Sequence, residues 1–475
     1  MSVVLLFSVK RPFLLAALLL AAGVAAAQAQ PPAAPSPAAG ATVSAPLPWP
    51  ARLPVESGLK PETVALKGPG WSPMGTIEPV KPPIMAIHLS SRESAAAARS
   101  QKEDWDLLCT RLAGAADCAP QFEKSGGFLF VPSYDDEPVT PSPSRASLMF
   151  RFISARRAAG QANAKPPAVI VERTWFALYD PLPPKSKPGD PPVAEVVPDP
   201  RALVVLLPGM FGTPTDQIVG LTRRLRQEGY SVLRMMSQPS RFTESVTYAL
   251  PLDGDLAAAI PPIAADLTDR AAEAAYAVES AVLYVQQERP ALRGLPRFAI
   301  GMSGGAMLLP VVVAREPEAY TGAVSIAGGV DYLRILTTSN YVDWINAVRV
   351  KWIAPPAANA GGIPAVKPAP SSQRLEELAK LYRAAAPLDS VNLMVLVKGV
   401  PWLMLHGTTD KAVPASTGEE MWELLGKPER ITIKGGHEWL FMTLSGRFNT
   451  ITEWIDKRLQ PAAATPARAQ PAGAR

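Results

Sequence analysis

Runs of apolar residues in the second half of the chain alternate with segments in which apolar residues recur at helical spacing. The run Ala202 to Leu207 contains no polar residue, which is typical of a strand buried on both faces of a parallel sheet. Further runs, each bounded by turn residues, predict strands at 168–178, 231–236, 298–300, 323–330, 402–405 and 430–433. Strands separated by helical segments indicate an α/β fold with a mainly parallel sheet.

Two helices that pack on this sheet can be placed from the spacing of their apolar residues and from the residues at their ends. Thr215 is a suitable N-cap for a helix with Ile218, Leu221 and Leu225 on one face, and Gly229 ends it. A second helix is predicted over 266–288, where alanine and valine recur at helical spacing before Pro290.

Two segments fit this alternation less well. Residues 80–167 contain short apolar runs such as Gly127 to Val131 and no catalytic pattern, so we interpret them as an accessory N-terminal segment or as extra elements at the sheet edge. Between 331 and 387 the pattern loosens into an aromatic stretch, a Pro/Ala/Gly stretch and a helical one. This second segment is predicted to be a lid-like insertion, and 168–460 is the predicted catalytic domain.

Composition narrows the function classes. Hydrophobic residues make up 48% of the 475 residues, which excludes a disordered protein, and the 52 prolines concentrate outside the predicted sheet. Lys and Arg number 47 against 42 Asp and Glu. This small, scattered excess argues against nucleic acid as a partner.

The amino terminus has the pattern of a secretory signal. Lys10 and Arg11 precede an apolar run from Phe13 to Val24, and Ala27-Gln28-Ala29 offers a small-x-small cleavage site. We therefore predict a signal peptide over 1–29, a periplasmic or secreted mature protein and no stable membrane span after cleavage. Residues 30–79 are predicted to be a Pro/Ala-rich linker, and 461–475 a disordered tail.

Export bears on the redox state of the two cysteines. Cys109 and Cys118 are close in sequence, and an oxidising compartment would join them in a disulfide, with two buried free thiols as the alternative. Two cysteines and three dispersed histidines form no zinc motif of the usual spacing, so no metal site is predicted.

Candidate chemistry is concentrated at Gly301-Met302-Ser303-Gly304-Gly305, which follows a short apolar strand and precedes a helical pattern. A strand-to-helix turn this tight requires small flanking residues and projects the serine hydroxyl outward. The N–H groups at the start of the helix favour the negative charge that develops in acyl transfer. Ser303 is the candidate nucleophile.

A serine nucleophile needs a base, and the chain has three histidines. His437 lies in the glycine-rich loop Lys434 to Trp439 after a strand, where a base can reach a nucleophile. His406 ends an apolar strand and is better suited to stabilising its turn, and His88 lies far upstream. We therefore choose His437.

The acid is expected between serine and histidine in sequence. Asp410 follows the strand that ends at Leu405 and lies in the turn before Val413-Pro414. Asp331 is the alternative acid, because it follows the preceding strand, although it could equally cap the segment after it. We favour Asp410.

An oxyanion hole completes such a site. One donor would be the N–H of Gly304, directly after the nucleophile. The second would come from Met210, or alternatively Phe211, in the Gly-rich turn Pro208 to Pro214 after the strand ending at Leu207.

With these motifs the chain resembles the α/β-hydrolase superfamily from about Ala168 to Leu459. The resemblance implies an eight-stranded, mostly parallel sheet with helices on both faces, a Ser-Asp-His triad at the carboxyl ends of the strands, and a lid after the sixth strand. Many members carry His-Gly where this chain has Pro208-Gly209.

The expected activity is that of an exported serine hydrolase acting on a small-molecule ester or thioester, with no cofactor. A serine peptidase on the same fold is the first alternative. A non-catalytic binding protein on a hydrolase scaffold is the second, and the presence of serine, acid and histidine in order argues against it.

Overall fold

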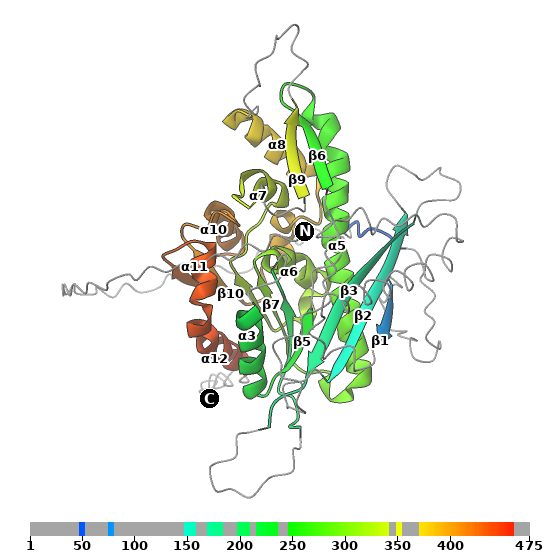
Figure 1. Ribbon diagram of the computed structural model, residues 1–475, viewed down its shortest axis with the longest axis vertical. Coiled ribbons are helices and arrows are strands. Elements are labelled where there is room, and N and C mark those ends of the chain that lie inside the picture. Colours follow the sequence, from blue (N-terminus) through cyan, green and yellow to red (C-terminus); the bar gives the residue numbers. More distant parts are fainter. Residues whose placement is uncertain are drawn as a thin grey trace, which may run out of the picture. The chain divides into compact units, whose positions relative to one another are not determined.

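A nine-stranded sheet forms the centre of the protein in a computed structural model, which describes residues 47–52, 75–79, 147–157, 169–183, 197–209, 215–235, 246–341, 348–353 and 370–459 (Figure 1). The strand order is β1-β2-β3-β5-β4-β7-β8-β10-β11. The six strands from β5 to β11 in this order pair in parallel, and the three pairings at the other edge are antiparallel.

The parallel strands coincide with the apolar runs of the sequence. They are β4 (Leu203–Leu207), β5 (Ser231–Met235), β7 (Arg297–Met302), β8 (Gly322–Ile326), β10 (Trp402–Gly407) and β11 (Glu429–Ile433). Their carboxyl ends lie along one edge of the sheet, as in any parallel arrangement. The predicted mainly parallel α/β sheet with helices on both faces is confirmed.

The antiparallel edge extends the sheet beyond the predicted domain start. It consists of β1 (Thr76–Pro79), β2 (Leu148–Arg157) and β3 (Val169–Tyr179). β2 pairs with β3 over its whole length, from Leu148 opposite Leu178 to Arg157 opposite Val169. Residues 148–157 thus agree with the second of the two interpretations of residues 80–167, that of extra elements at the sheet edge. With β1 the sheet has nine strands rather than the eight that the resemblance implies.

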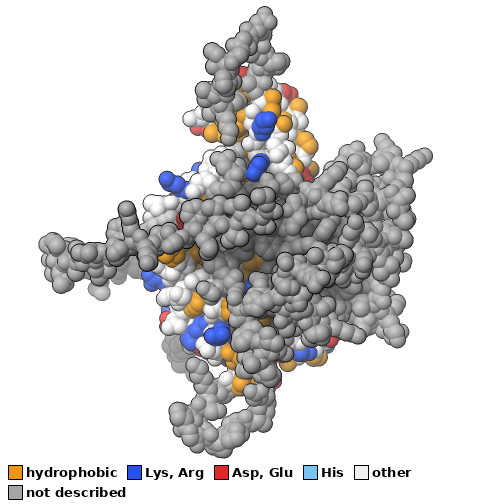
Figure 2. All heavy atoms as spheres, in the orientation of Figure 1, with side chains coloured by type: hydrophobic (Ala, Val, Ile, Leu, Met, Phe, Trp, Pro, Cys, Tyr) orange, Lys and Arg blue, Asp and Glu red, His pale blue; other side chains and the backbone are white. Residues whose placement is uncertain are grey.

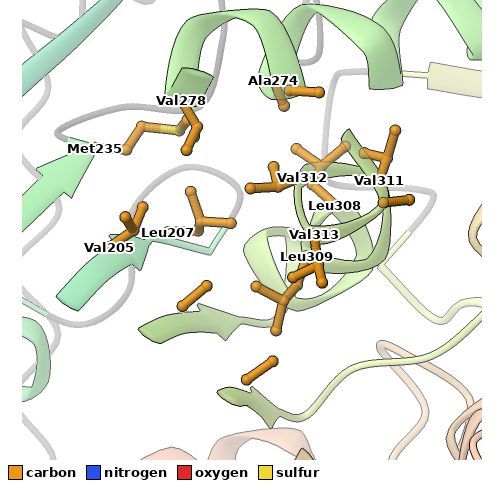
Figure 3. Close-up of a cluster of buried hydrophobic side chains, with 14 of the residues drawn as sticks. Val205, Leu207, Met235, Ala274, Val278, Leu308, Leu309, Val311, Val312 and Val313 are labelled. Atoms are coloured by element: carbon orange, nitrogen blue, oxygen red, sulfur yellow. The ribbon is translucent and has the colours of Figure 1, made fainter. Parts of the chain in front are cut away.

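Alternating side chains of each inner strand pack on opposite faces of the sheet. In β4, Leu203, Val205 and Leu207 belong to one buried cluster, and Val204 and Leu206 belong to the other. Figure 3 shows part of the first of these clusters, where strand residues such as Leu207 meet helix residues such as Val278 and Leu308. This two-sided burial explains why the sequence of the strand is apolar without alternation.

Helices cover both faces. α5 (Leu256–Glu288), α6 (Gly304–Arg315), α9 (Ser390–Val397) and α10 (Ala415–Leu424) contribute to the first cluster, and α3 (Thr215–Gln227), α11 (His437–Met442) and α12 (Phe448–Leu459) to the second. Short 3-10 turns occur at Pro290–Leu292, Pro317–Ala319 and Leu444–Arg447. The sheet is thus the middle of three layers.

α5 is longer than its sequence pattern predicts. The predicted start at 266 is wrong: the helix begins at Leu256, and Asp255 caps it by accepting the N–H groups of Ala257 and Ala258. Pro261 and Pro262 lie inside the helix, where they remove backbone donors, and such residues in a sequence usually indicate that a helix has not yet begun.

The early turns of α5 pack on a second, smaller sheet. It pairs β6 (Val246–Pro251) with β9 (Val348–Ile353) in parallel. A third buried cluster joins β6 and the start of α5 to α7 (Tyr332–Thr338) and α8 (Ser372–Ala385). The insertion after β8 therefore packs against a segment from before β7, and the two together form one small unit (Figure 1).

Charged side chains on the face drawn in Figure 2 are spread over the part of that face not covered by grey atoms. Among the described residues no helix is long and apolar enough to cross a membrane.

Candidate active site

Ser303 lies in a strained turn between β7 and α6. Its backbone has φ 50° and ψ −117°, outside the regions that a side chain normally allows, at a cost of about 1–2 kcal/mol. The Ser303 N–H donates to the carbonyl of Ile326 on β8 at 2.8 Å, which fixes the turn against the neighbouring strand. The side chain is half-buried, so the hydroxyl remains reachable.

Close backbone contacts around this turn explain its glycines. A Cβ on Gly305 would lie 2.4 Å from the carbonyl oxygen of Pro208, and one on Gly301 would lie 2.5 Å from that of Gly305. Side-chain carbons do not approach backbone atoms so closely, so only glycine fits either position. The elbow therefore packs directly on the end of β4, which leads into the predicted oxyanion turn.

His437 begins α11 and faces Ser303. Its Nε2 lies 2.9 Å from the Ser303 Oγ, and its Nδ1 lies 2.7 Å from an oxygen of Asp410. The ring is buried. These two contacts place the Nδ1 proton toward the carboxylate, which leaves Nε2 as the acceptor of the serine proton.

Asp410 is buried in the turn after β10. One of its oxygens contacts His437, and the other accepts the N–H groups of Ala412 and Val413, each at 2.9 Å. A carboxylate that accepts three N–H groups is held in one orientation.

The loops that carry acid and base are joined through the backbone. Thr409 N–H donates to the carbonyl of Gly435 at 3.1 Å, and Thr408 N–H donates to that of Ile433 at 3.0 Å. A Cβ on Gly407 would lie 3.0 Å from the Gly435 oxygen. The separation of acid and base is therefore set by the pairing of β10 with β11.

The structure places the alternative acid, Asp331, away from His437. Asp331 is fully buried at φ 70°, and one oxygen caps α7 by accepting the Arg334 N–H at 3.1 Å. Its other oxygen lies 2.9 Å from the Arg383 Nε. Burial raises the pKa of Asp331, while its hydrogen bonds and the guanidinium oppose that rise. Both oxygens are thus engaged in holding the insertion.

A second buried carboxylate, that of Asp389, also holds the insertion in place. It accepts the N–H groups of Asp331 and Tyr332 at one end of the insertion and of Val391 at the other, and the hydroxyl of Tyr382 lies 2.7 Å away. Burial, with the negative charge of Asp331, raises the pKa of Asp389 to about 6. Sequence analysis missed this residue because its partners are distant in sequence.

Of the other candidate residues considered in the sequence analysis, Gly304 and His406 are described by the structure and five are not. Gly304 is the first residue of α6, directly after Ser303, so its N–H has no acceptor within the helix. His406 is buried against Gly418 of α10, and burial lowers its pKa. Outside the described residues lie Met210, Phe211, His88, Cys109 and Cys118.

Two aromatic rings that sequence analysis did not assign to the site lie beside His437. The ring centroids of Phe441 and Tyr341 are 5.1 Å and 5.7 Å from that of the imidazole. Phe441 is one helical turn after the histidine, a spacing that could have indicated the contact. Tyr341 belongs to the insertion, and only the fold brings it near.

Among the described residues, no group of three or more His, Cys, Asp or Glu side chains could hold a metal ion. The groups that the structure brings together at Ser303 are a hydroxyl, an imidazole and a carboxylate.

Comparisons with known proteins give matches of low similarity, and only to solved structures. No family model and no curated protein matches the chain. Similar solved structures include Est1E from Butyrivibrio proteoclasticus, with 14% identity over 62% of this chain and 96% of that one and a TM-score of 0.35. An esterase from Pyrococcus furiosus has 11% identity over 61% and 88%, with a TM-score of 0.35. The acylaminoacyl peptidase of Pyrococcus horikoshii has 13% identity over 65% and 41%, with a TM-score of 0.37.

The fold assignment therefore rests on the protein's own topology. A mainly parallel sheet with helices on both faces, a serine in a strand-to-helix elbow, and Ser, Asp and His in that chain order define the α/β-hydrolase fold. In topology and in the arrangement of Ser303, Asp410 and His437, the protein has the α/β-hydrolase fold.

Proposed function

We propose that this protein is an exported serine hydrolase that cleaves a carboxylic ester or thioester of a small molecule through an acyl-enzyme. The observation that carries the proposal is the pair of contacts made by His437, at 2.9 Å to Ser303 and at 2.7 Å to Asp410. A histidine that bridges a strained, half-buried serine and a buried carboxylate is the arrangement that activates a hydroxyl at neutral pH.

The proposed reaction uses the same groups in both half-reactions. The Ser303 Oγ attacks the acyl carbon while its proton passes to the His437 Nε2, and the N–H of Gly304 stabilises the oxyanion, with Met210 proposed as the second donor. The bond to the leaving oxygen or sulfur then breaks, and His437 returns the proton to it. In the second half-reaction water attacks the acyl carbon and gives its proton to His437. The bond from that carbon to Ser303 Oγ then breaks, and His437 returns the proton to Oγ, which releases the carboxylic acid and the free serine.

Asp410 transfers no proton in the proposed cycle. It holds the Nδ1 proton and stabilises the imidazolium that forms in each half-reaction. Its orientation is already fixed by the N–H groups of Ala412 and Val413, so no reorganisation is needed when the charge develops.

A fluorophosphonate probe tests the nucleophile directly. We expect one adduct per chain, located on the peptide that contains Ser303, because the probe reacts with serines activated in this way. Intact mass and peptide mapping measure it. An unmodified protein, or an adduct on another serine, would contradict the proposal.

The substrate class is tested separately with a panel of p-nitrophenyl esters of increasing acyl length, matching thioesters and peptide amides. Ester or thioester turnover is expected to exceed amide turnover at equal concentration. Faster cleavage of the peptide amides would make the protein a peptidase instead, and labelling without turnover of any panel member would contradict the assigned substrate class.

Export is proposed from the amino-terminal pattern, with a mature chain that begins near Gln30 and a disulfide between Cys109 and Cys118. The intact mass of the protein recovered from the cell exterior or periplasm is expected to match that start and to rise by two hydrogens on reduction. If both cysteines alkylate without reductant, the disulfide is absent; a cytoplasmic chain with residues 1–29 intact would contradict export.

A further inference from the structure

The segment that follows α7 meets both of the loops that carry the triad acid and base. Asn340 N–H donates to the carbonyl of Lys411, the neighbour of Asp410, at 3.0 Å. The next residue, Tyr341, has its own N–H fixed at 3.0 Å by the Ser339 hydroxyl. Residues 339–341 of the insertion thus have a defined path beside this part of the site.

Tyr341 contacts the base itself. Its ring centroid lies 5.7 Å from that of the His437 imidazole, with the two planes at 76°, an edge-on arrangement that favours aromatic pairs. The Tyr341 hydroxyl donates to the carboxylate of Glu438, the residue directly after the base. Ring and hydroxyl therefore attach the insertion to His437 and its neighbour at once.

The ionisation of this pair supports the hydrogen bond. Burial and the carboxylate of Glu438 raise the pKa of Tyr341, so the phenol stays protonated as the donor. The same hydrogen bond lowers the pKa of Glu438, which stays charged as the acceptor. A bond between a neutral donor and a charged acceptor is stronger than one between two neutral groups.

The imidazole of a triad must keep one orientation while its charge changes. Its two nitrogens are fixed by Ser303 and Asp410, but the bond to the serine is broken in the acyl-enzyme, when Oγ is esterified. At that stage the ring depends on Asp410 and on packing. Phe441 packs on it from the helix of the base itself, and Tyr341 does so from the insertion.

We infer that Tyr341 is a positioning residue for His437: its ring, tied to Glu438, makes the insertion after β8 part of the device that keeps the base aligned with acid and nucleophile. The kinetic consequence rests on the proposed function, whereas the alignment of the imidazole does not. Tyr341 is assigned no proton transfer.

The test compares Tyr341→Ala, which removes ring and hydroxyl, with Tyr341→Phe, which keeps the ring. An aromatic contact of this kind corresponds to about a two- to tenfold change in rate, so Tyr341→Ala is expected to lower kcat by that factor and to leave KM within about twofold. Tyr341→Phe is expected to retain at least about half of the wild-type kcat. Met442→Ala is the matched control, because Met442 lies on α11, the helix of His437, and its side chain is 69% exposed.

A second readout needs no substrate. The chain has three histidines, so proton NMR of histidine-labelled protein, assigned with His437→Ala, can follow the Nδ1 proton between His437 and Asp410. We expect this proton to give a low-field signal in the wild type, in Tyr341→Phe and in Met442→Ala. In Tyr341→Ala we expect the signal to broaden or vanish, because the imidazole ring of His437 becomes mobile.

The outcomes separate the two proposals. Retention of both the signal and wild-type kcat in Tyr341→Ala would overturn the positioning role, as would a rise in KM at constant kcat, which would make Tyr341 a substrate contact. If the wild type is neither labelled nor active, the proposed function fails, and the NMR signal alone then decides whether Tyr341 aligns His437.

Discussion

Replacing Ser303 or His437 with alanine is expected to lower kcat by about six orders of magnitude in each case, and the double variant is expected to be no worse than either single one. The reason is that the two groups act as one unit: without the base the hydroxyl is not activated, and without the hydroxyl the base has no proton to accept. The 2.9 Å contact between His437 Nε2 and Ser303 Oγ is the physical link that makes the losses overlap. Ester hydrolysis measured on all three variants checks this.

Stability is expected to change little in Ser303→Ala. The strain at this position comes from φ 50°, which is equally unfavourable for serine and alanine because both have a Cβ. The substitution therefore neither relieves nor adds strain. Melting temperatures within a few degrees of the wild type would separate lost chemistry from lost folding.

His406→Ala provides the control for the base. His406 is also buried, and α10 packs so closely on it that a Cβ on Gly418 would lie 2.7 Å from its Nδ1. Truncating it is expected to lower the melting temperature while kcat stays within severalfold of the wild type. If His437→Ala kept tens of per cent of wild-type activity, the base would be a different residue.

The positions of Ser303, Asp410 and His437 could be predicted because each follows a strand that is recognisable locally. The parallel strands β7, β10 and β11 end at one edge of the sheet, so a residue just after each strand is brought to that edge whatever the intervening sequence does. Local sequence signals and one topological rule are enough to bring the three side chains together.

The contacts of Tyr341 and Asp389 could not be predicted in this way. Tyr341 and Glu438 are separated by 97 residues, and Asp389 binds the N–H of Asp331 across 58. Such pairs depend on how an insertion folds back, which no periodicity in the sequence records. From the sequence, residues 148–157 belong either to an accessory segment or to the sheet edge, and their pairing with β3 decides for the sheet edge.

Asp410→Asn is expected to lower kcat by about four orders of magnitude, with little change in melting temperature. The asparagine side chain keeps the shape of the carboxylate, and its amide oxygen can still accept N–H groups such as those of Ala412 and Val413, which now lie 2.9 Å from one carboxylate oxygen. What is lost is the negative charge 2.7 Å from His437 Nδ1, which fixes the tautomer and stabilises the imidazolium.

Asp331→Asn is the matched comparison, because this aspartate is also buried and also follows a strand of the sheet. Its carboxylate caps α7 and contacts Arg383, so its replacement is expected to cost about 1–3 kcal/mol of unfolding free energy through a weakened buried hydrogen-bonded ion pair. kcat is expected to stay within severalfold of the wild type, since no Asp331 atom bonds His437 in the described structure.

The two variants are therefore predicted to separate rate from stability in opposite ways. Ester turnover and thermal or urea unfolding, measured on the same preparations, check both effects. A large loss of kcat in Asp331→Asn with an unchanged melt, together with near-normal turnover in Asp410→Asn, would move the triad acid to the end of β8. The geometry predicts the reverse, because the His437 Nδ1 proton has Asp410, and not Asp331, as its acceptor at 2.7 Å.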